Sequence, residues 1–473
     1  MPTPDARPSS HLQIAFPPLP AFAPPVPEVR TLRNGLRVFL MEDHELPLVS
    51  VRAMARAGAA YEAADKVGLA SVTTTVMRTG GTAANPGDRL DDELGSLAAA
   101  IDVSNGALTT TASAECLSDR LPRVLELFAD VLRRPAFPED KIELARMLLR
   151  TAISRRNDQV GAMAHRAFQI AMYGKASPFA REPEYATVDA IARDDLRAFH
   201  DRFLRPDRMR IGLVGDFDTE RAFALVDQFF GDWPKASAPL PAVATDPIAL
   251  EGRRVFYAEK DDVNQTHVLL GAPGVRRSDP DWPALRVASF ILGAGGFSSR
   301  LVKKVRTELG LAYAVGGGFS AEYDRTGLFR AVCQTKTESA GQAIEAIVGE
   351  IERFLAAPPD DEELATAKDQ IQNAEIFEYD SREEVLARRM TLDHHGYPPD
   401  FLERVNARIR GVEAREVHAA IQRHVDPRKL NVVAVGPRDG MDRPLSDFGP
   451  VTTLDLAIPS SPPRPGSAGI AAP

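Results

Sequence analysis

Two segments of the chain repeat each other at a fixed separation, and this repeat constrains the fold more than any other feature. The segment RPDRMRIGLVGDFD begins at Arg205 and DPRKLNVVAVGPRD begins at Asp426, so matching positions lie 221 residues apart. Each copy is typical of an apolar strand that is entered through a proline and left through a glycine. A helix-like stretch precedes both copies, at residues 196–203 and 417–424. The repeat therefore predicts two duplicated halves.

Proline-rich stretches separate these halves from each other and from the chain ends. The segment PKASAPLPAVATDP, from Pro234 to Pro247, is typical of an interdomain linker. Both ends of the chain are rich in Pro, Ser and Ala and offer little to bury. We therefore expect disordered tails at 1–27 and 456–473, halves at 28–235 and 251–455, and a linker at 236–250.

Local patterns in the first half mix strands with helices. Asn34-Gly35 between two short apolar runs predicts a hairpin, and the alternation at residues 48–57 predicts a strand. Next comes GLASVTTTVMRTGGT, which predicts a helix from about Val67 closed by two glycines. Two further helices are predicted by apolar residues at helical spacing over 121–132 and 142–152. Without a regular βαβ alternation, this mixture favours an α+β fold.

Charge and hydropathy exclude several classes of partner. The 57 Lys and Arg residues against 66 Asp and Glu give a net charge of −9, without a basic block that would follow a phosphate backbone. No apolar run approaches the roughly 18 to 20 residues of a membrane span. We expect a soluble protein that binds neither nucleic acid nor membrane. The N-terminus lacks the pattern of a secretory signal, which indicates a cytoplasmic location as the sequence stands and a periplasmic one if a signal has been removed.

The helix from Val67 has the outline of a metal-binding helix without the residue types of one. Ser71, Thr74 and Thr75 share one face, because residues three and four apart are helical neighbours. The surrounding GLA and GGT resemble the frame of the pitrilysin/insulinase family of inverzincin metallopeptidases, whose helix carries H-x-x-E-H. In that family a glutamate about 76 residues further on completes the zinc site, and the matching position here is Thr151. Neutral hydroxyls cannot replace imidazole and carboxylate around Zn²⁺, so we expect this chain to bind no metal.

Neither these hydroxyls nor the paired histidines and the cysteines indicate a different chemical site. The hydroxyls could line the remnant of a cavity and bond to backbone or water, which we favour. A hydroxyl nucleophile would need a basic partner, and no histidine or lysine stands at nearby helical spacing. The pair His394-His395 precedes a glycine-proline loop, and we interpret it as part of a solvated loop. Cys116 and Cys333 lack a CxxC pairing and are interpreted as buried apolar thiols.

A second family signature lies in the second half. GAGGFSSRLVKKVRTELGLAYAVGGGFS, residues 293–320, combines a flexible glycine turn, a basic helix and a strand containing Tyr313. It resembles the same family's G-G-x-x-S-R-L-x-x-x-[IV]-R-x-x-x-G-L-A-Y. The resemblance implies that Arg306 and Tyr313 face the active chamber and hold peptide carbonyl groups. An arginine fork and a phenol suit that task, although a solvated arginine and a tyrosine packed on a sheet remain the alternative.

The resemblance covers nearly everything between the tails and implies a fold and a function. The implied fold is two duplicated α/β-roll halves, each a mixed sheet backed by helices, in a clam-like shell. Some members work as two subunits, one with zinc and one with the Arg/Tyr element. The implied function is a non-catalytic subunit, inert alone, that supplies Arg306 and Tyr313 to a zinc-binding H-x-x-E-H partner acting on peptides. The alternatives are a scaffold built on an inactive peptidase shell and, with least support, an enzyme of unrelated chemistry.

Overall fold

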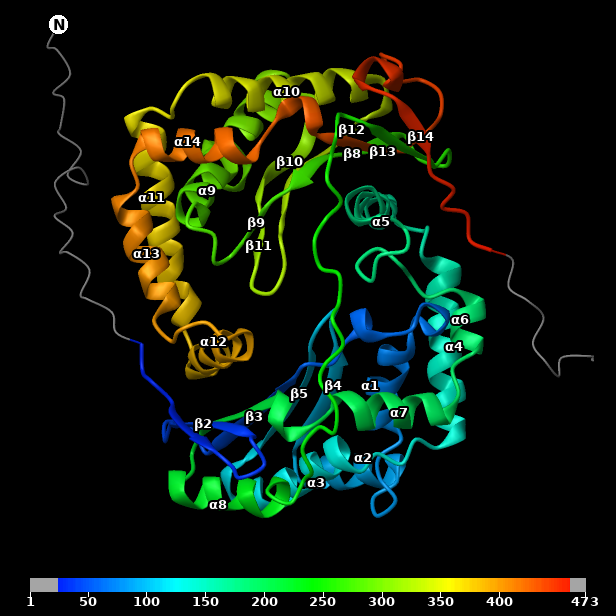
Figure 1. Ribbon diagram of the computed structural model, residues 1–473, viewed down its shortest axis with the longest axis vertical. Helices are drawn as coiled ribbons and strands as arrows, with labels where there is room; N and C mark the ends of the chain where they lie inside the picture. The colour runs from blue at the N-terminus through cyan, green and yellow to red at the C-terminus, as the bar shows by residue number, and fades with distance from the viewer. Residues whose placement is uncertain (1–23, 460–473) are drawn as a thin grey trace, which may run out of the picture.

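The computed structural model describes residues 24–459 as an α+β protein built around two six-stranded sheets (Figure 1). Residues 1–23 and 460–473, which hold most of the two predicted tails, lie outside the described residues. None of the described helices is long and apolar enough to cross a membrane.

The first sheet has the strand order β1-β2-β6-β3-β5-β4. Its strands are β1 (Glu28–Thr31), β2 (Arg37–Glu42), β3 (Leu48–Ala55), β4 (Ala100–Asn105), β5 (Thr110–Leu117) and β6 (Met209–Gly215). β1 and β2 pair antiparallel around the predicted turn, where Gly35 adopts a φ of +87° that favours glycine. The buried Asn34 amide donates to the carbonyl of Phe230 at 2.7 Å and fixes this hairpin to the last helix of the first half.

Helices cover one face of this sheet, with the first core between the two layers. They are α1 (Leu69–Thr79), α2 (Gly87–Ser96), α3 (Leu121–Arg133), α7 (Arg193–Phe203) and α8 (Thr219–Phe230), with α4 (Glu139–Arg155) beside α1 and α6 (Tyr185–Asp189) beside α4. The predicted helical spacing is observed in α3, where Leu121, Leu125 and Phe128 are fully buried in the core.

The second sheet has the order β10-β12-β8-β13-β7-β14. Its strands are β7 (Val255–Glu259), β8 (Gln265–Pro273), β10 (Ala312–Phe319), β12 (Leu328–Lys336), β13 (Asn431–Gly436) and β14 (Val451–Thr453), and β9 (Val275–Arg276) pairs separately with β11 (Ala321–Glu322). The helices of this half are α9 (Trp282–Ser289), α10 (Ala340–Ala356), α11 (Asp361–Ile376), α13 (Phe401–Gly411) and α14 (Ala414–His424). A second core lies between these helices and the sheet.

Five of the six strands in each sheet share one topology, which confirms the predicted duplication, and the remaining edge strands differ because β1 pairs antiparallel with β2 whereas β14 pairs parallel with β7. The central run β2-β6-β3-β5 corresponds to β7-β13-β8-β12, and the edge strands β4 and β10 occupy matching places. The parallel pairing of β2 with β6 recurs between β7 and β13. The repeated sequence segments form β6 and β13, each preceded by a helix, α7 or α14.

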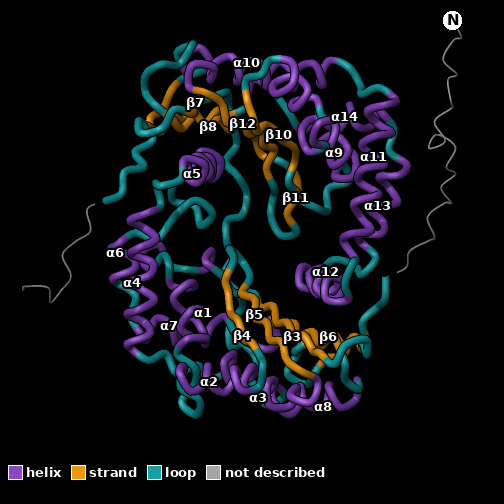
Figure 2. Tube along the Cα trace, turned by 180° about the vertical axis from the view of Figure 1, so that it is seen from behind, coloured by secondary structure: helices purple, strands orange, loops and turns teal. Residues whose placement is uncertain are grey.

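Each half extends one helix onto the sheet of the other half. α5 (Val160–Tyr173), from the first half, packs against β8 and β13, and α12 (Arg382–His395), from the second half, packs against β6 (Figures 1 and 2). A glycine in each sheet makes room for the crossing helix. A Cβ added at Gly271 would lie 2.4 Å from the Phe168 ring, and one at Gly212 would lie 2.4 Å from the Met390 sulfur. The halves are therefore interlocked rather than joined by a linker alone.

The segment between the halves contains neither helix nor strand from residue 236 to residue 250. It passes between the two halves in Figure 1 and is attached at both ends. Ala238 accepts a hydrogen bond from Arg208 through its carbonyl, and the backbone amide of Ile248 donates to the carbonyl of Met172 at 2.8 Å. These bonds hold the connection against the body of the protein.

Candidate functional site

The helix that resembles a zinc helix, α1, is capped by a buried carboxylate. Gly68 begins the helix with a φ of +107°, which a side chain would strain. Glu62 accepts hydrogen bonds from the backbone amides of Gly68 at 3.1 Å and Ala70 at 2.6 Å. These amides have no partner within the helix, so the carboxylate stabilises the first turn. Burial raises the pKa of Glu62, and the two amide bonds oppose that rise.

Two of the three threonines in the run of α1 bond their hydroxyls to carbonyls of their own helix. Thr73 and Thr74 are buried, and their hydroxyls donate to the carbonyls of Leu69 at 2.8 Å and Ala70 at 3.0 Å. The Thr74 hydroxyl also lies 3.2 Å from the Asn105 side-chain oxygen at the end of β4. Ser71 and Thr75 are half-buried on the same face. Hydrogen bonding to the preceding turn explains how β-branched polar residues are accommodated in this helix.

The fourth position of the expected metal set lies on α4, which packs against α1. Thr151 is exposed, and its hydroxyl donates to the Met147 carbonyl of its own helix at 3.0 Å. The donor set at Ser71, Thr74, Thr75 and Thr151 therefore consists of neutral hydroxyls, two of which are already bonded to helix carbonyls. Zinc in proteins takes thiolate, imidazole and carboxylate ligands, so these residues do not fit the ion.

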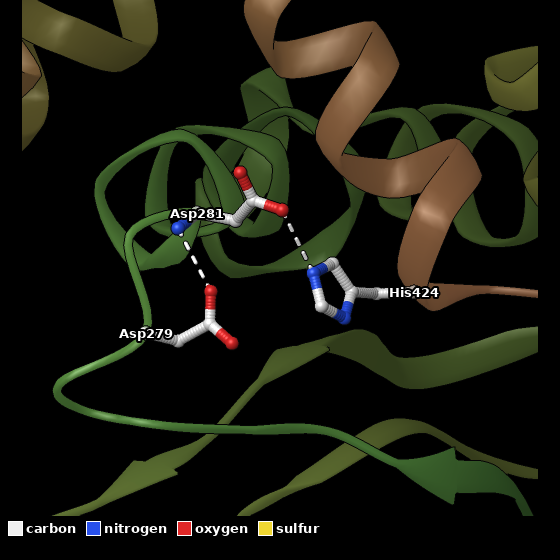
Figure 3. A group of neighbouring side chains, drawn as sticks. All are labelled: Asp279, Asp281 and His424. Carbon is white, nitrogen blue, oxygen red and sulfur yellow. Dashed lines mark hydrogen bonds and ion pairs between the residues drawn. The ribbon is translucent and has the colours of Figure 1, made fainter.

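A different group of side chains has the spacing of a metal site, but an arginine already pairs with one of its carboxylates. Within residues 24–459, Asp279, Asp281 and His424 bring one ligand atom each within 4.8 Å of one another (Figure 3). The Asp281 carboxylate accepts hydrogen bonds from His424 at 2.9 Å and from the Arg423 guanidinium at 2.6 and 2.8 Å. Arg423 is the largest cause of the lowered Asp281 pKa. This cluster attaches the start of α9 to the end of α14.

Arg306 and Tyr313 come together on the surface of the second half. Arg306 lies in a π-helical turn at residues 302–308, and Tyr313 lies near the start of β10. The Arg306 guanidinium carbon is 4.7 Å from the ring centres of both Tyr313 and Phe297. Tyr313 is 84% exposed and Phe297 is 70% exposed. The arginine therefore lies at a cation–π distance from each of two exposed rings.

Sequence reasoning found Arg306 and Tyr313 and missed Phe297. Phe297 follows the glycine turn in GAGGFSSR, and its contact with Arg306 depends on how the turn folds back over the helix. Glu62 was also missed, because it lies six residues before Gly68 and therefore outside the N-cap position where a capping side chain is expected. Within the described chain, no hydrogen bond, ion pair or ring contact joins Arg306 or Tyr313 to the hydroxyls of α1.

The interpretation of His394-His395 as a solvated loop is wrong. Both residues form the C-terminal end of α12, and His394 is only 1% exposed because α12 crosses onto the first sheet. The His394 Nε2 atom lies 3.2 Å from the Thr109 hydroxyl, and the His395 ring stacks on Tyr323 at 5.1 Å. Burial lowers the pKa of His394 to about 3. The pair belongs to the contact between the two halves.

Comparison with known proteins identifies the family. A family model described as insulinase (peptidase family M16) matches residues 37–178, and another, described as the peptidase M16 inactive domain, matches residues 190–371. Together these ranges cover more than half of the chain. The chain belongs to the insulinase peptidase family. It lacks the H-x-x-E-H motif of that family, with Ser71, Thr74 and Thr75 in its place.

Several known proteins resemble the chain along most of its length. An uncharacterized zinc protease of Streptomyces coelicolor is 24% identical, over 72% of this chain and 76% of its own. A probable mitochondrial-processing peptidase subunit beta of Arabidopsis thaliana is 24% identical, over 87% and 79%. A crystal structure of a peptidase M16 inactive domain from Pseudomonas fluorescens has a TM-score of 0.78, with 24% identity over 88% and 98%. This structure confirms the predicted fold.

Proposed function

We propose that the chain is the non-catalytic subunit of a heterodimeric zinc metallopeptidase. In this proposal it contributes Arg306 and Tyr313 to the active chamber of a homologous partner that carries H-x-x-E-H and zinc. The observation that carries the proposal is the contrast between the metal-site positions and the pair Arg306 and Tyr313. The metal-site positions hold only hydroxyls, whereas Arg306 is half-buried and lies beside the exposed ring of Tyr313.

The geometry around Arg306 suits it to bind a peptide. The rings of Phe297 and Tyr313 lie 4.7 Å from the guanidinium carbon, and no carboxylate of the described chain forms an ion pair with Arg306. Guanidinium N–H groups point outward in the plane of the group, and those of Arg306 form no hydrogen bond with a described residue, so they can donate to carbonyl or carboxylate oxygens. Holding the side chain in place also reduces the entropy lost on binding.

Tyr313 adds a second donor beside this arginine. Its side chain is 84% exposed, so the phenol is accessible to a molecule outside this chain. A phenol O–H can donate to an oxygen that gains negative charge during peptide hydrolysis. In a chamber closed by a partner, the two residues would hold the substrate while the partner activates the water. The Arabidopsis relative, which is named as a subunit of a peptidase, supports the subunit role.

Reconstitution with a zinc-bearing homologue tests the proposal. The chain is co-expressed with an H-x-x-E-H homologue from the same genome, and kcat/KM is measured on fluorogenic peptides. We expect activity only in the mixture, and a loss of about 10² to 10³-fold with Arg306→Ala, the range for removing one donor to a transition-state oxyanion. Tyr313→Phe removes only the hydroxyl. Arg428→Ala is the control, because Arg428 is an exposed arginine of the same half that pairs locally with Asp426.

Two results would contradict parts of this proposal. Full activity of the Arg306→Ala and Tyr313→Phe mixtures would remove the substrate-binding role while leaving the partnership. Failure of any H-x-x-E-H homologue to associate with the chain would favour the scaffold alternative.

A further inference from the structure

A cavity of about 820 Å³ lies between the two halves, and neither Arg306 nor Tyr313 lines it. One wall comes from α5 and from residues 178–182 of the first half, and the other comes from β10, β12 and the loop between them. The cavity also reaches Ala107, two residues after the Asn105 side chain that contacts Thr74 of α1. Its volume falls in the roughly 300–1,000 Å³ range of ligand sites.

Four arginines and two glutamates line this cavity, so its lining carries a net positive charge. Arg166 is paired with Glu182 at 3.4 Å and also contacts Asn157. Arg181 donates to the backbone carbonyl of Glu62 rather than to a carboxylate. Arg325 and Arg330 form no ion pair with any described residue. The cavity therefore presents guanidinium groups that have no anionic partner within the described chain.

Arg325 is held in place without its full set of hydrogen bonds. Its guanidinium lies over the Phe179 ring at 4.6 Å, and its Nε atom is buried without an acceptor. The Arg181 Nε atom, in the same cavity, also lacks one. A buried donor without a partner costs free energy, so an acceptor that enters the cavity is favoured. Arg330 acts across the cavity and, after burial, is the second cause of the lowered pKa of His165.

The shape of the opposite wall suits a peptide backbone. Three successive glycines of β10, residues 316–318, line the cavity, so main chain rather than side chains faces an occupant there. Gly318 is required by its close approach to α9, where a Cβ would lie 2.7 Å from the Ser289 Cβ. Phe179, Phe319 and Leu328 add apolar surface. Apolar walls, exposed backbone and free guanidinium groups together suit an extended chain that carries carboxylates better than a small inorganic anion.

We infer that this cavity binds an acidic segment of a peptide, with Arg325 and Arg330 holding its carboxylates. The peptide class rests on the proposed function, and the cavity adds a preference for Glu and Asp in the substrate. The recognition is by charge-assisted hydrogen bonds from planar forks, which pair with carboxylates in a bidentate way. The cavity would select peptides before the partner subunit acts on them.

Peptide binding to the purified single chain tests this inference. Fluorescence anisotropy is measured with a labelled decapeptide of alternating Glu and Ala, and with its Lys and Ala counterpart. We expect the Glu peptide to bind at least about tenfold more tightly, and Arg325→Gln and Arg330→Gln each to weaken it about tenfold. Arg415→Gln is the matched control, since Arg415 is 83% exposed at its side chain and lies on α14, outside the cavity lining.

Each other outcome overturns the inference. Equal affinity for the two peptides, or an unchanged affinity in both cavity variants, would show that the arginines do not select carboxylates. Inorganic phosphate that binds as tightly as the Glu peptide would assign the cavity to small anions. The assay needs neither the partner nor hydrolysis, so its failure leaves the Arg306-dependent reconstitution intact. Conversely, failure of the reconstitution does not alter the measured peptide preference.

Discussion

Acidification should destabilise the fold through His394. The residue lies on α12 and is buried against the β4–β5 turn. Its Nε2 atom is near the Thr109 hydroxyl, and its Nδ1 atom is buried without a hydrogen-bond partner. Burial is the largest cause of its lowered pKa, and the neighbouring charges of His395, Arg56 and Arg210 lower it further. At mildly acidic pH the folded protein therefore keeps this imidazole neutral, whereas the same imidazole binds a proton in the unfolded chain.

The size of the effect follows from the two pKa values. The pKa is about 3 in the folded protein, and about 6.5 in an unfolded chain. The unfolded state binds more protons between these values, so stability falls as pH drops below about 6.5 and the loss is complete near pH 3. At pH 5, which is about 1.5 pH units below the unfolded pKa, the expected loss is about 2 kcal/mol at ~1.36 kcal/mol per unit.

Urea unfolding at pH 7 and pH 5 measures this loss. The wild-type chain should lose about 2 kcal/mol more between the two pH values than His394→Gln, in which no imidazole can be protonated. Other titrating groups are present in both proteins, so they cancel in the comparison. His44→Gln is the control of opposite sign, because Asp216 raises the pKa of the exposed His44 and its contribution is lost as pH rises. Identical pH dependence in wild type and His394→Gln would refute the reasoning.

Three further predictions concern stability and accessibility. Replacing Glu62 with Ala should cost about 1–3 kcal/mol in urea unfolding, because the amides of Gly68 and Ala70 lose their buried acceptor; an unchanged midpoint would contradict the cap. Deleting residues 454–473 should speed hydrogen exchange in α5 and α6. The reason is that the Leu456 carbonyl accepts a hydrogen bond from the Asn157 side chain at 2.8 Å and that Ile458 packs against the cluster at Ile153. Protection equal to that of the full chain would show that this segment contributes nothing to the stability of these helices. Burial raises the pKa of Cys116 to about 11 and that of Cys333 to about 12, so both thiols should react with a disulfide reagent only in denaturant, and rapid labelling of the native chain would be inconsistent with their burial.

The sequence predicted the elements that depend on local chemistry. The Asn34-Gly35 hairpin, the apolar spacing of α3 and the proline-to-glycine strands β6 and β13 are all present in the structure. Each depends on residues close together in the chain, where turn preference and periodicity act directly. The duplication was inferred from a single repeated segment, which forms the equivalent strands β6 and β13.

Contacts between distant segments could not be predicted in this way. The crossing of α12 onto the first sheet, which buries His394, depends on packing between elements that are far apart in the chain, such as β6 at residues 209–215 and α12 at residues 382–395. The same limit applies to Phe297 beside Arg306 and to the cavity that gathers Arg166 and Arg325 from opposite halves. The threonines of α1 were identified as an incomplete metal site, but their bonds to the preceding helical turn required the structure.

The metal content of the purified single chain tests the central claim most directly. The chain is expressed without a partner in medium containing zinc, and bound metal is counted per chain alongside hydrolysis of a fluorogenic peptide. Hydroxyls at residues 71, 74, 75 and 151 predict no tightly held zinc and no hydrolysis. One zinc ion per chain that survives dialysis against a weak chelator, together with hydrolysis by the chain alone, would contradict the account.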